Sequence, residues 1–276
     1  MNKRTNLRLL AASLIVALLG VGAVTAPASA TPPAHSIDRS KSVQKPTIVL
    51  VHGAFADSSG WSLVGAALQA EGYPVLAFSN PLRGVQYDSA YLRSFLDTIT
   101  GPVVLVGHSY GGAVITNAAT GDPDVKSLVY VAAYALDEGE TVQDANALGG
   151  GSTELGDNLL IRPFPGAAEG DADAYIDPTA FRSIFAQDLP RPVADTLAAS
   201  QRPAALAAFG TPSGVPAWKT IPSWYIVASQ DKTISPRAER AMAKRAGATT
   251  VEVNSSHVPM LSKPLTVISV IRKAAR

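Results

Sequence analysis

The sequence predicts an α/β fold, in which helices cover both faces of a mostly parallel, doubly wound sheet. Three observations lead to this expectation. Short runs of strand-forming residues alternate along the chain with amphipathic helical stretches. The first run, residues 47–52, is continuously apolar, which is typical of a strand buried on both faces. The composition, 47% hydrophobic and 16% charged, indicates a chain with a sizeable core.

The order of the elements follows from the positions of these runs. Strands are predicted over residues 47–52, 74–78, 103–106, 127–132, 222–229 and 250–253. Helices are predicted over 61–70, 87–99, 111–119, 237–246 and 261–275, the last one broken near Pro264. Strands that alternate with helices in this way form parallel βαβ units.

One long segment, residues 137–216, breaks the alternation. It is rich in alanine, glycine, proline and acidic residues and contains no strong strand pattern. Because a structureless loop of this length is rare inside a compact domain, we expect an inserted helical cap. Its helices are predicted near residues 179–187 and 193–208.

The N-terminus has the pattern of a secretory signal peptide over residues 1–30. Lys3, Arg4 and Arg8 form a basic region, an apolar run follows, and small residues end at Ala30. The apolar run is short for a bilayer of about 30 Å. We therefore expect cleavage after Ala30, a secreted protein, and no membrane association of the mature chain.

The rest of the composition limits the partners of the protein. Residues 31–45 are predicted to be a flexible lead-in to a domain over 46–276. With 23 basic and 22 acidic residues, the charge gives no reason to expect nucleic acid or an anionic membrane, and favours a small neutral substrate. The chain has no cysteine and no metal or cofactor motif, so we expect no metal, cofactor or disulfide. The oligomeric state does not follow from the sequence.

A glycine-rich pentapeptide carries the main catalytic signal. Ser109 lies in Gly107-His108-Ser109-Tyr110-Gly111, directly after an apolar strand and directly before a predicted helix. This context is typical of a serine nucleophile on a tight strand-to-helix turn, where the flanking glycines avoid steric clashes. Ser109 is therefore the predicted nucleophile.

A serine hydroxyl needs a base that removes its proton. Of the four histidines, His35 lies in the lead-in, and His52 and His108 lie beside glycines at strand ends, where a structural role is expected. His257, after the last predicted strand, remains as the base. Asp231 follows the strand over 222–229 and is the predicted orienting carboxylate, because functional loops gather at the carboxyl ends of parallel strands.

Two backbone amides are predicted to form the oxyanion hole. One belongs to Tyr110, directly after the nucleophile, and the other to Ala54, which follows the first strand. Candidates for an apolar pocket that binds the acyl or aryl group are the aromatic residues Phe55, Tyr110, Tyr134, Phe181 and Phe185. For the two cap phenylalanines, ordinary packing is an equally good interpretation.

Four segments resemble one branch of the α/β-hydrolase superfamily, which contains plant methyl esterases, hydroxynitrile lyases and bacterial esterases. They are residues 49–54, 106–112, 129–133 and 257–264. The resemblance implies an α/β-hydrolase fold, the triad Ser109, Asp231 and His257, and no cofactor. It also implies Ala54 and Tyr110 as oxyanion donors. These assignments agree with the interpretation from the residues alone.

Two positions distinguish the activities of this branch. The similar lyases carry threonine where Gly53 stands and lysine where Val258 stands, and that lysine helps to hold the departing cyanide. Both departures from the lyase pattern point to an esterase. Together with the predicted signal peptide, the resemblance therefore implies a secreted serine carboxylic ester hydrolase that acts on small esters through an acyl-serine intermediate. Aryl esters, methyl esters and lactones stay open as substrates. The alternatives are a hydroxynitrile lyase or perhydrolase activity on the same triad, and a non-catalytic receptor for a small ligand.

Overall fold

The computed structural model describes residues 45–276. The predicted signal peptide and the lead-in up to residue 44 lie outside the described residues. Within 45–276, no helix combines the length and the apolar character that crossing a bilayer requires.

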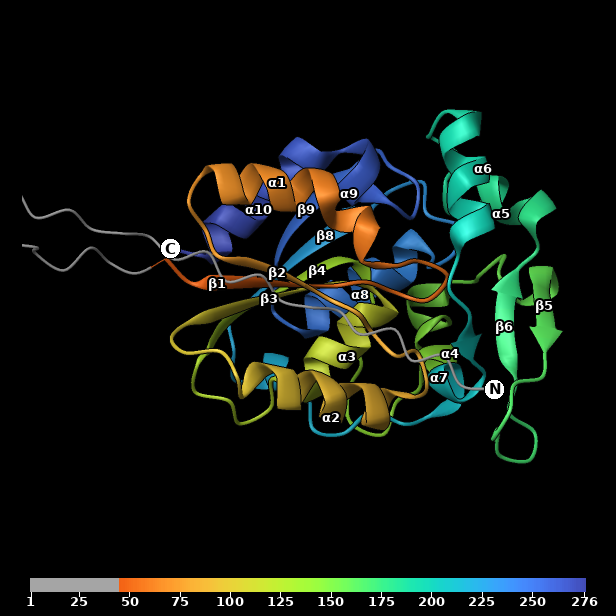
Figure 1. Cartoon of the computed structure of the whole chain (residues 1–276), viewed down its shortest axis with the longest axis horizontal. Helices are drawn as coiled ribbons and strands as arrows, with labels where there is room; N and C mark the ends of the chain where they lie inside the picture. Colours follow the sequence, from red (N-terminus) through yellow and green to blue (C-terminus); the bar gives the residue numbers. More distant parts are fainter. Residues whose placement is uncertain (1–44) are drawn as a thin grey trace, which may run out of the picture. The chain divides into compact units, whose positions relative to one another are not determined.

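A parallel sheet of six strands forms the centre of the domain (Figure 1). The strand order is β2-β1-β3-β4-β8-β9, and every neighbouring pair is parallel. The strands are β1 (Thr47–Val51), β2 (Val75–Phe78), β3 (Val103–Ser109), β4 (Val125–Ala133), β8 (Ser223–Ala228) and β9 (Thr249–Val253). All residues of β1 and β3 are buried, as the continuous apolar runs predict. The predicted fold class is confirmed.

Helices cover both faces of this sheet (Figure 1). One face carries α1 (Ser62–Ala70), α9 (Pro259–Ser262) and α10 (Pro264–Ala274). The other face carries α2 (Val85–Leu96), α3 (Tyr110–Ala118) and α8 (Pro236–Arg245). The predicted break near Pro264 is confirmed, because this proline begins α10.

The segment between β4 and β8 forms the expected insertion at one end of the sheet (Figure 1). Its helices are α4 (Val142–Ala145), α5 (Pro178–Phe185), α6 (Arg191–Ser200) and α7 (Ala207–Gly210). It also contains an antiparallel sheet of three strands, β5 (Leu159–Arg162), β6 (Asp173–Ile176) and β7 (Ala204–Ala205), for which the sequence has no distinct pattern. These strands are two to four residues long, too short for a clear alternation of apolar and polar residues.

The prediction of a cap helix over 193–208 is wrong about where this helix ends. Helix α6 ends at Ser200, and Gln201 is already extended, with a ψ of 137°. Pro203 disfavours helical backbone in the residue before it. The Gln201 side chain instead bonds the backbone of Ile176 in β6, through the amide N–H and the carbonyl oxygen, each at 2.9 Å.

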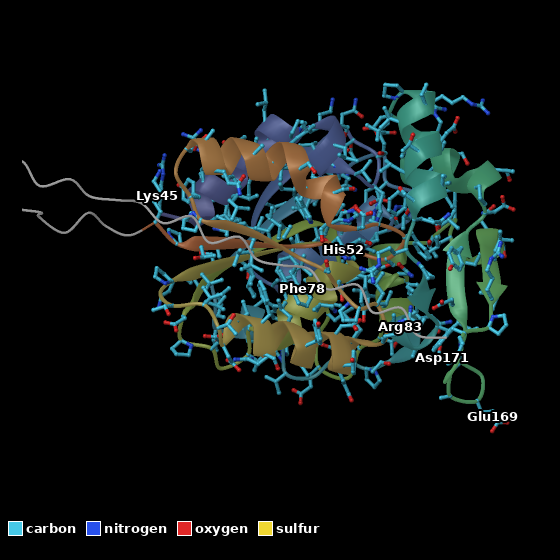
Figure 2. All side chains as sticks on the ribbon, viewed as in Figure 1. Lys45, His52, Phe78, Arg83, Glu169 and Asp171 are labelled. Atoms are coloured by element: carbon cyan, nitrogen blue, oxygen red, sulfur yellow. The ribbon has the colours of Figure 1, made fainter. Side chains whose placement is uncertain are left out.

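The insertion is joined to the edge of the sheet by an ion pair and by backbone contacts. Arg83 lies after β2, and its Nη1 is 2.7 Å from Oδ1 of Asp173 in β6. The amide of Ala205 donates to the carbonyl oxygen of Leu82 at 2.9 Å. Figure 2 shows Arg83 toward the cap, whereas Lys45 lies at the opposite end of the domain.

Candidate active site

Ser109 lies at the turn from β3 into α3, as the motif predicts. Its backbone has φ 52° and ψ −125°, a strained conformation for a residue with a side chain. The turn leaves no room beside it. A Cβ on Gly107 would lie 2.6 Å from the carbonyl oxygen of Gly111, and a Cβ on Gly111 would lie 2.5 Å from that of Val51. The two glycines are therefore required for the close packing that holds Ser109 at the end of its strand.

Asp231 and His257 form a buried pair. Oδ2 of Asp231 is 2.5 Å from Nδ1 of His257, and both side chains are fully buried. Oδ1 of Asp231 accepts from the amides of Thr233 at 2.7 Å and Ile234 at 2.9 Å. Because a carboxylate only accepts hydrogen bonds, the proton of a neutral His257 lies on Nδ1 and its Nε2 carries a lone pair. That Nε2 is buried and has no hydrogen-bond partner among residues 45–276.

His108 joins the strand of Ser109 to the loop of His257. Its Nε2 lies 2.7 Å from the carbonyl oxygen of His257, so this nitrogen carries a proton and donates it. The centroids of the two imidazole rings are 4.7 Å apart, and the centroid of the Phe185 ring is 4.8 Å from that of the His257 ring. Burial and then the nearby His257 hold the pKa of His108 well below its ordinary value. His108 is therefore a neutral structural donor.

Of the two predicted oxyanion donors, Tyr110 directly follows Ser109, and Ala54 follows Gly53, which packs against Ser109. Tyr110 is the first residue of α3, so its amide is one of those that have no acceptor within the helix. Gly53, which precedes Ala54, lies so close that a Cβ on it would be 2.6 Å from Ser109 Cβ and 3.2 Å from Oγ. The threonine that similar lyases carry would not fit here without a movement of the turn.

His52 holds the turn that contains Gly53 and Ala54. Its Nε2 accepts from the amide of Asn80 at 3.0 Å, so its proton lies on Nδ1 and is donated to Gly53 O at 2.9 Å. Burial is the main reason why the pKa of His52 is lowered to about 4. His52 is therefore uncharged at neutral pH, and the expected structural role agrees with its contacts.

The five aromatic residues that were predicted to share one pocket do not do so. Phe55, Phe181 and Phe185 line a small cavity of about 20 Å³, which is room for about one water molecule. Tyr134 lines a separate pocket of about 350 Å³. The Tyr110 ring is fully buried, and its hydroxyl donates to Asp88 at 2.7 Å, so Tyr110 lines neither.

The larger pocket is lined by residues of the cap and by Tyr134, which directly follows β4. The backbone amide of Tyr134 donates a hydrogen bond to the carbonyl oxygen of Ser109 at 3.1 Å, so this side of the pocket is close to the predicted nucleophile. Phe209 lines this pocket, and its ring stacks on that of Phe55, with centroids 6.0 Å apart. Because Phe55 lines the smaller cavity, this pair of rings lies between the two cavities. The pocket is lined by Tyr134, Val142, Gln143, Asn146, Thr153, Leu155, Gly156, Leu159, Leu206, Phe209 and Gly210.

Three acidic residues around the site were not found from the sequence. Asp88 and Glu239 are fully buried in the first turns of α2 and α8. Asp188, in the cap, accepts hydrogen bonds from the amide of Ser256 at 3.0 Å and from its hydroxyl. Acidic residues in the first turn of a helix are normally explained by the helix dipole, so their sequence positions carried no signal of burial. Within 45–276, no three acidic or histidine side chains form a group that could hold a metal ion.

Comparison with known proteins identifies the family. Residues 48–270 match the family described as the Alpha/beta hydrolase family. The chain belongs to this family. Methylesterase 17 of Arabidopsis thaliana is 25% identical over 263 residues, which are 87% of this chain and 95% of the relative. The pyrethroid hydrolase of Sphingobium wenxiniae is 29% identical over 236 residues, which are 79% and 83% of the two chains.

Solved structures agree with this assignment. The crystal structure of a pyrethroid hydrolase from Sphingobium faniae superposes with a TM-score of 0.70 at 25% identity, and covers 83% of this chain and 97% of its own. Polyneuridine aldehyde esterase superposes with a TM-score of 0.73 over 84% of this chain and 100% of its own; at 19% identity it supports the fold alone. The names of these relatives agree with the expected branch and support a carboxylic ester hydrolase.

Proposed function

We propose that this protein is a serine carboxylic ester hydrolase that acts on small neutral esters through an acyl-Ser109 intermediate. The observation that carries the proposal is the state of His257. Its Nδ1 proton is held by Asp231, and its Nε2 is buried and has no other partner among the described residues. A lone pair in that position suits a general base.

The proposed reaction has two steps. Nε2 of His257 takes the proton of Ser109 as Oγ attacks the acyl carbon, and the amides of Ala54 and Tyr110 stabilise the developing oxyanion. The imidazolium then returns the proton to the leaving alcohol. Water then attacks the acyl carbon as the same nitrogen takes its proton. The bond between the acyl carbon and Oγ breaks, the acid leaves, and the imidazolium returns the proton to Ser109. Asp231 stabilises the imidazolium in both steps and stays ionised.

The larger pocket supports the choice of a neutral substrate. All of its lining side chains are uncharged, and most are apolar. A volume of about 350 Å³ is within the range of sites for small molecules. The relatives named methylesterase and pyrethroid hydrolase support an ester as the substrate class.

A kinetic comparison tests this function. The protein should hydrolyse p-nitrophenyl and methyl esters of uncharged acids, and it should discriminate against an ester whose acid part carries a second, free carboxylate. Ser109→Ala should abolish turnover, whereas Ser94→Ala, at an exposed position of α2, should not change it. Full activity of Ser109→Ala, or aldehyde release from a cyanohydrin without ester hydrolysis, would overturn the proposal.

We also propose that the protein is exported and that the signal peptide is removed after Ala30. The basic, apolar and small-residue regions of residues 1–30 support this. Mass spectrometry of the N-terminal peptide from the culture medium should find Thr31 as the first residue. Recovery of the protein only inside cells, with residues 1–30 still attached, would contradict export.

A further inference from the structure

The buried carboxyl group of Glu239 lies within hydrogen-bond reach of Asp231, the acidic residue of the proposed triad. Glu239 is in the first turn of α8 and is fully buried. Its Oε2 accepts from the amide of Ala228, the last residue of β8, at 3.1 Å. The carbonyl oxygen of the same Ala228 accepts from the amide of Asp231, also at 3.1 Å. Glu239 and Asp231 are therefore bonded to the same residue at the end of β8.

The second oxygen of Glu239 receives no proton from its surroundings. Oε1 is buried and has no hydrogen-bond partner among residues 45–276. The negative charge of an ionised Glu239 would raise the pKa values of two tyrosines, Tyr134 and Tyr225, but both hydroxyls donate their protons to other acceptors. Tyr225 donates to the carbonyl oxygen of Ala133, and Tyr134 donates to Oδ1 of Asn146 at 2.9 Å.

On balance, the charged groups around Glu239 disfavour an ionised carboxylate. Arg240 is a cation and favours the ionised form, but it is half exposed and is paired with Glu252, with an Nη2–Oε1 distance of 2.6 Å. The other charged neighbour is Asp231, an acid. Burial first, and then the negative charge of Asp231, raise the pKa of the Glu239 carboxyl well above its ordinary range.

We propose that Glu239 is a neutral carboxylic acid at neutral pH, and that its proton faces Asp231 and holds that carboxylate ionised and oriented toward His257. Glu239 is then a positioning residue that acts through Asp231. Two adjacent buried carboxyls favour this arrangement, because one of them keeps a proton while the other ionises. The kinetic role rests on the proposed function of the triad, whereas the protonation of Glu239 does not.

Infrared spectroscopy tests the proton without any substrate. At pH 7 the difference spectrum between the wild type and Glu239→Gln should contain the carbonyl stretch of a protonated carboxylic acid. The control is Glu252→Gln, because the ion pair with Arg240 lowers the pKa of Glu252 and keeps it ionised. Its difference spectrum should contain only the bands of a carboxylate. A carboxylate band for Glu239 would overturn the proposal.

Kinetics test the link to Asp231. Glu239→Gln keeps a neutral donor and should retain kcat to within about threefold, with the acid limb of kcat/KM at the same pH. Glu239→Leu removes the donor. It should lower kcat roughly tenfold with a smaller change in KM, and move the acid limb up by about half a pH unit, because Asp231 then stabilises the imidazolium more strongly.

The outcomes separate this inference from the proposed function. A downward shift of the acid limb in Glu239→Gln would mean that a negative charge had been removed, and would overturn the inference. A wild-type profile of Glu239→Leu would overturn the positioning role. If Glu239→Leu does not fold, the infrared spectrum and the pH profile of Glu239→Gln still decide whether Glu239 carries a proton. An infrared band of a protonated acid in a protein without esterase activity would contradict the proposed function, but not the proton on Glu239.

Discussion

His108 donates a hydrogen bond from Nε2 to the carbonyl oxygen of His257, over a distance of 2.7 Å. This bond joins the residue directly before the proposed nucleophile to the proposed base, although the two are 149 residues apart in the sequence. Because His108 is fully buried and neutral, the bond is not weakened by competition with water. We therefore expect the relative position of Ser109 and His257 to depend on it.

The first prediction concerns this bond. His108→Phe keeps an aromatic ring but removes the donor, and leaves a buried carbonyl unpaired at a cost of about 1–3 kcal/mol in the free energy of unfolding. Displacement of His257 should lower kcat/KM roughly tenfold to a hundredfold. His108→Gln, which retains an N–H donor, should lose less. Equal kcat/KM values for the Phe variant and the wild type would show that the bond does not position the base.

The second prediction concerns the space beside Ser109. Gly53→Ala introduces a Cβ that meets Ser109 Cβ at 2.6 Å, so the oxyanion turn must move away. We expect kcat to fall by roughly a hundredfold, the usual effect of losing one oxyanion donor. Gly60→Ala is the matched control, because its Cβ would meet only Met260 Cε, at 3.8 Å. A Gly53→Ala variant as active as Gly60→Ala would contradict this account of the turn.

The third prediction is a pH dependence of stability caused by His52. Its folded-state pKa is about 4 and its ordinary value is 6.5, so the unfolded chain binds more protons between these values. Above pH 6.5, His52 is neutral in both the folded and the unfolded chain. As the pH falls from 6.5 toward 4, protonation of His52 in the unfolded chain lowers the free energy of unfolding by a total of about 3 kcal/mol. Urea titrations from pH 7 to pH 4 should show a shallower decline for His52→Gln than for the wild type. Parallel curves would contradict the prediction.

The fourth prediction concerns the cap residue Asp188, which bonds the amide and hydroxyl of Ser256, next to His257. Asp188→Ala releases the loop that carries the base and should lower kcat roughly fivefold to tenfold. Asp195→Ala, in an exposed ion pair with Arg191, is the matched control and should behave like the wild type. The same kcat for both variants would mean that the cap does not hold this loop.

The sequence was sufficient to predict the sheet and the turn of Ser109. Continuous apolar strands and flanking glycines are local patterns, and the carboxyl ends of parallel strands must lie at one edge. That geometry explains why Asp231 and His257, predicted from their positions after strands, are found 2.5 Å apart. The roles of these residues in catalysis stay predictions.

The cap and the buried acids were not predictable in the same way. The strands β5, β6 and β7 are too short to show a period and depend on their partners across the chain. The burial of Glu239 and Asp88 depends on which face of a helix packs on the sheet. The pocket lined by Tyr134 also arises only when the cap folds over the strand ends.

The most direct test of the account is covalent labelling of the nucleophile. After reaction with a fluorophosphonate, intact-protein mass spectrometry should show one adduct per chain, and peptide mapping should find it on Ser109, because in the proposed mechanism Nε2 of His257 takes the proton of this hydroxyl. Ser109→Ala should take up no label and should have no esterase activity. An adduct on another residue, or an unlabelled wild type that still hydrolyses esters, would contradict the central claim that Ser109 is the nucleophile.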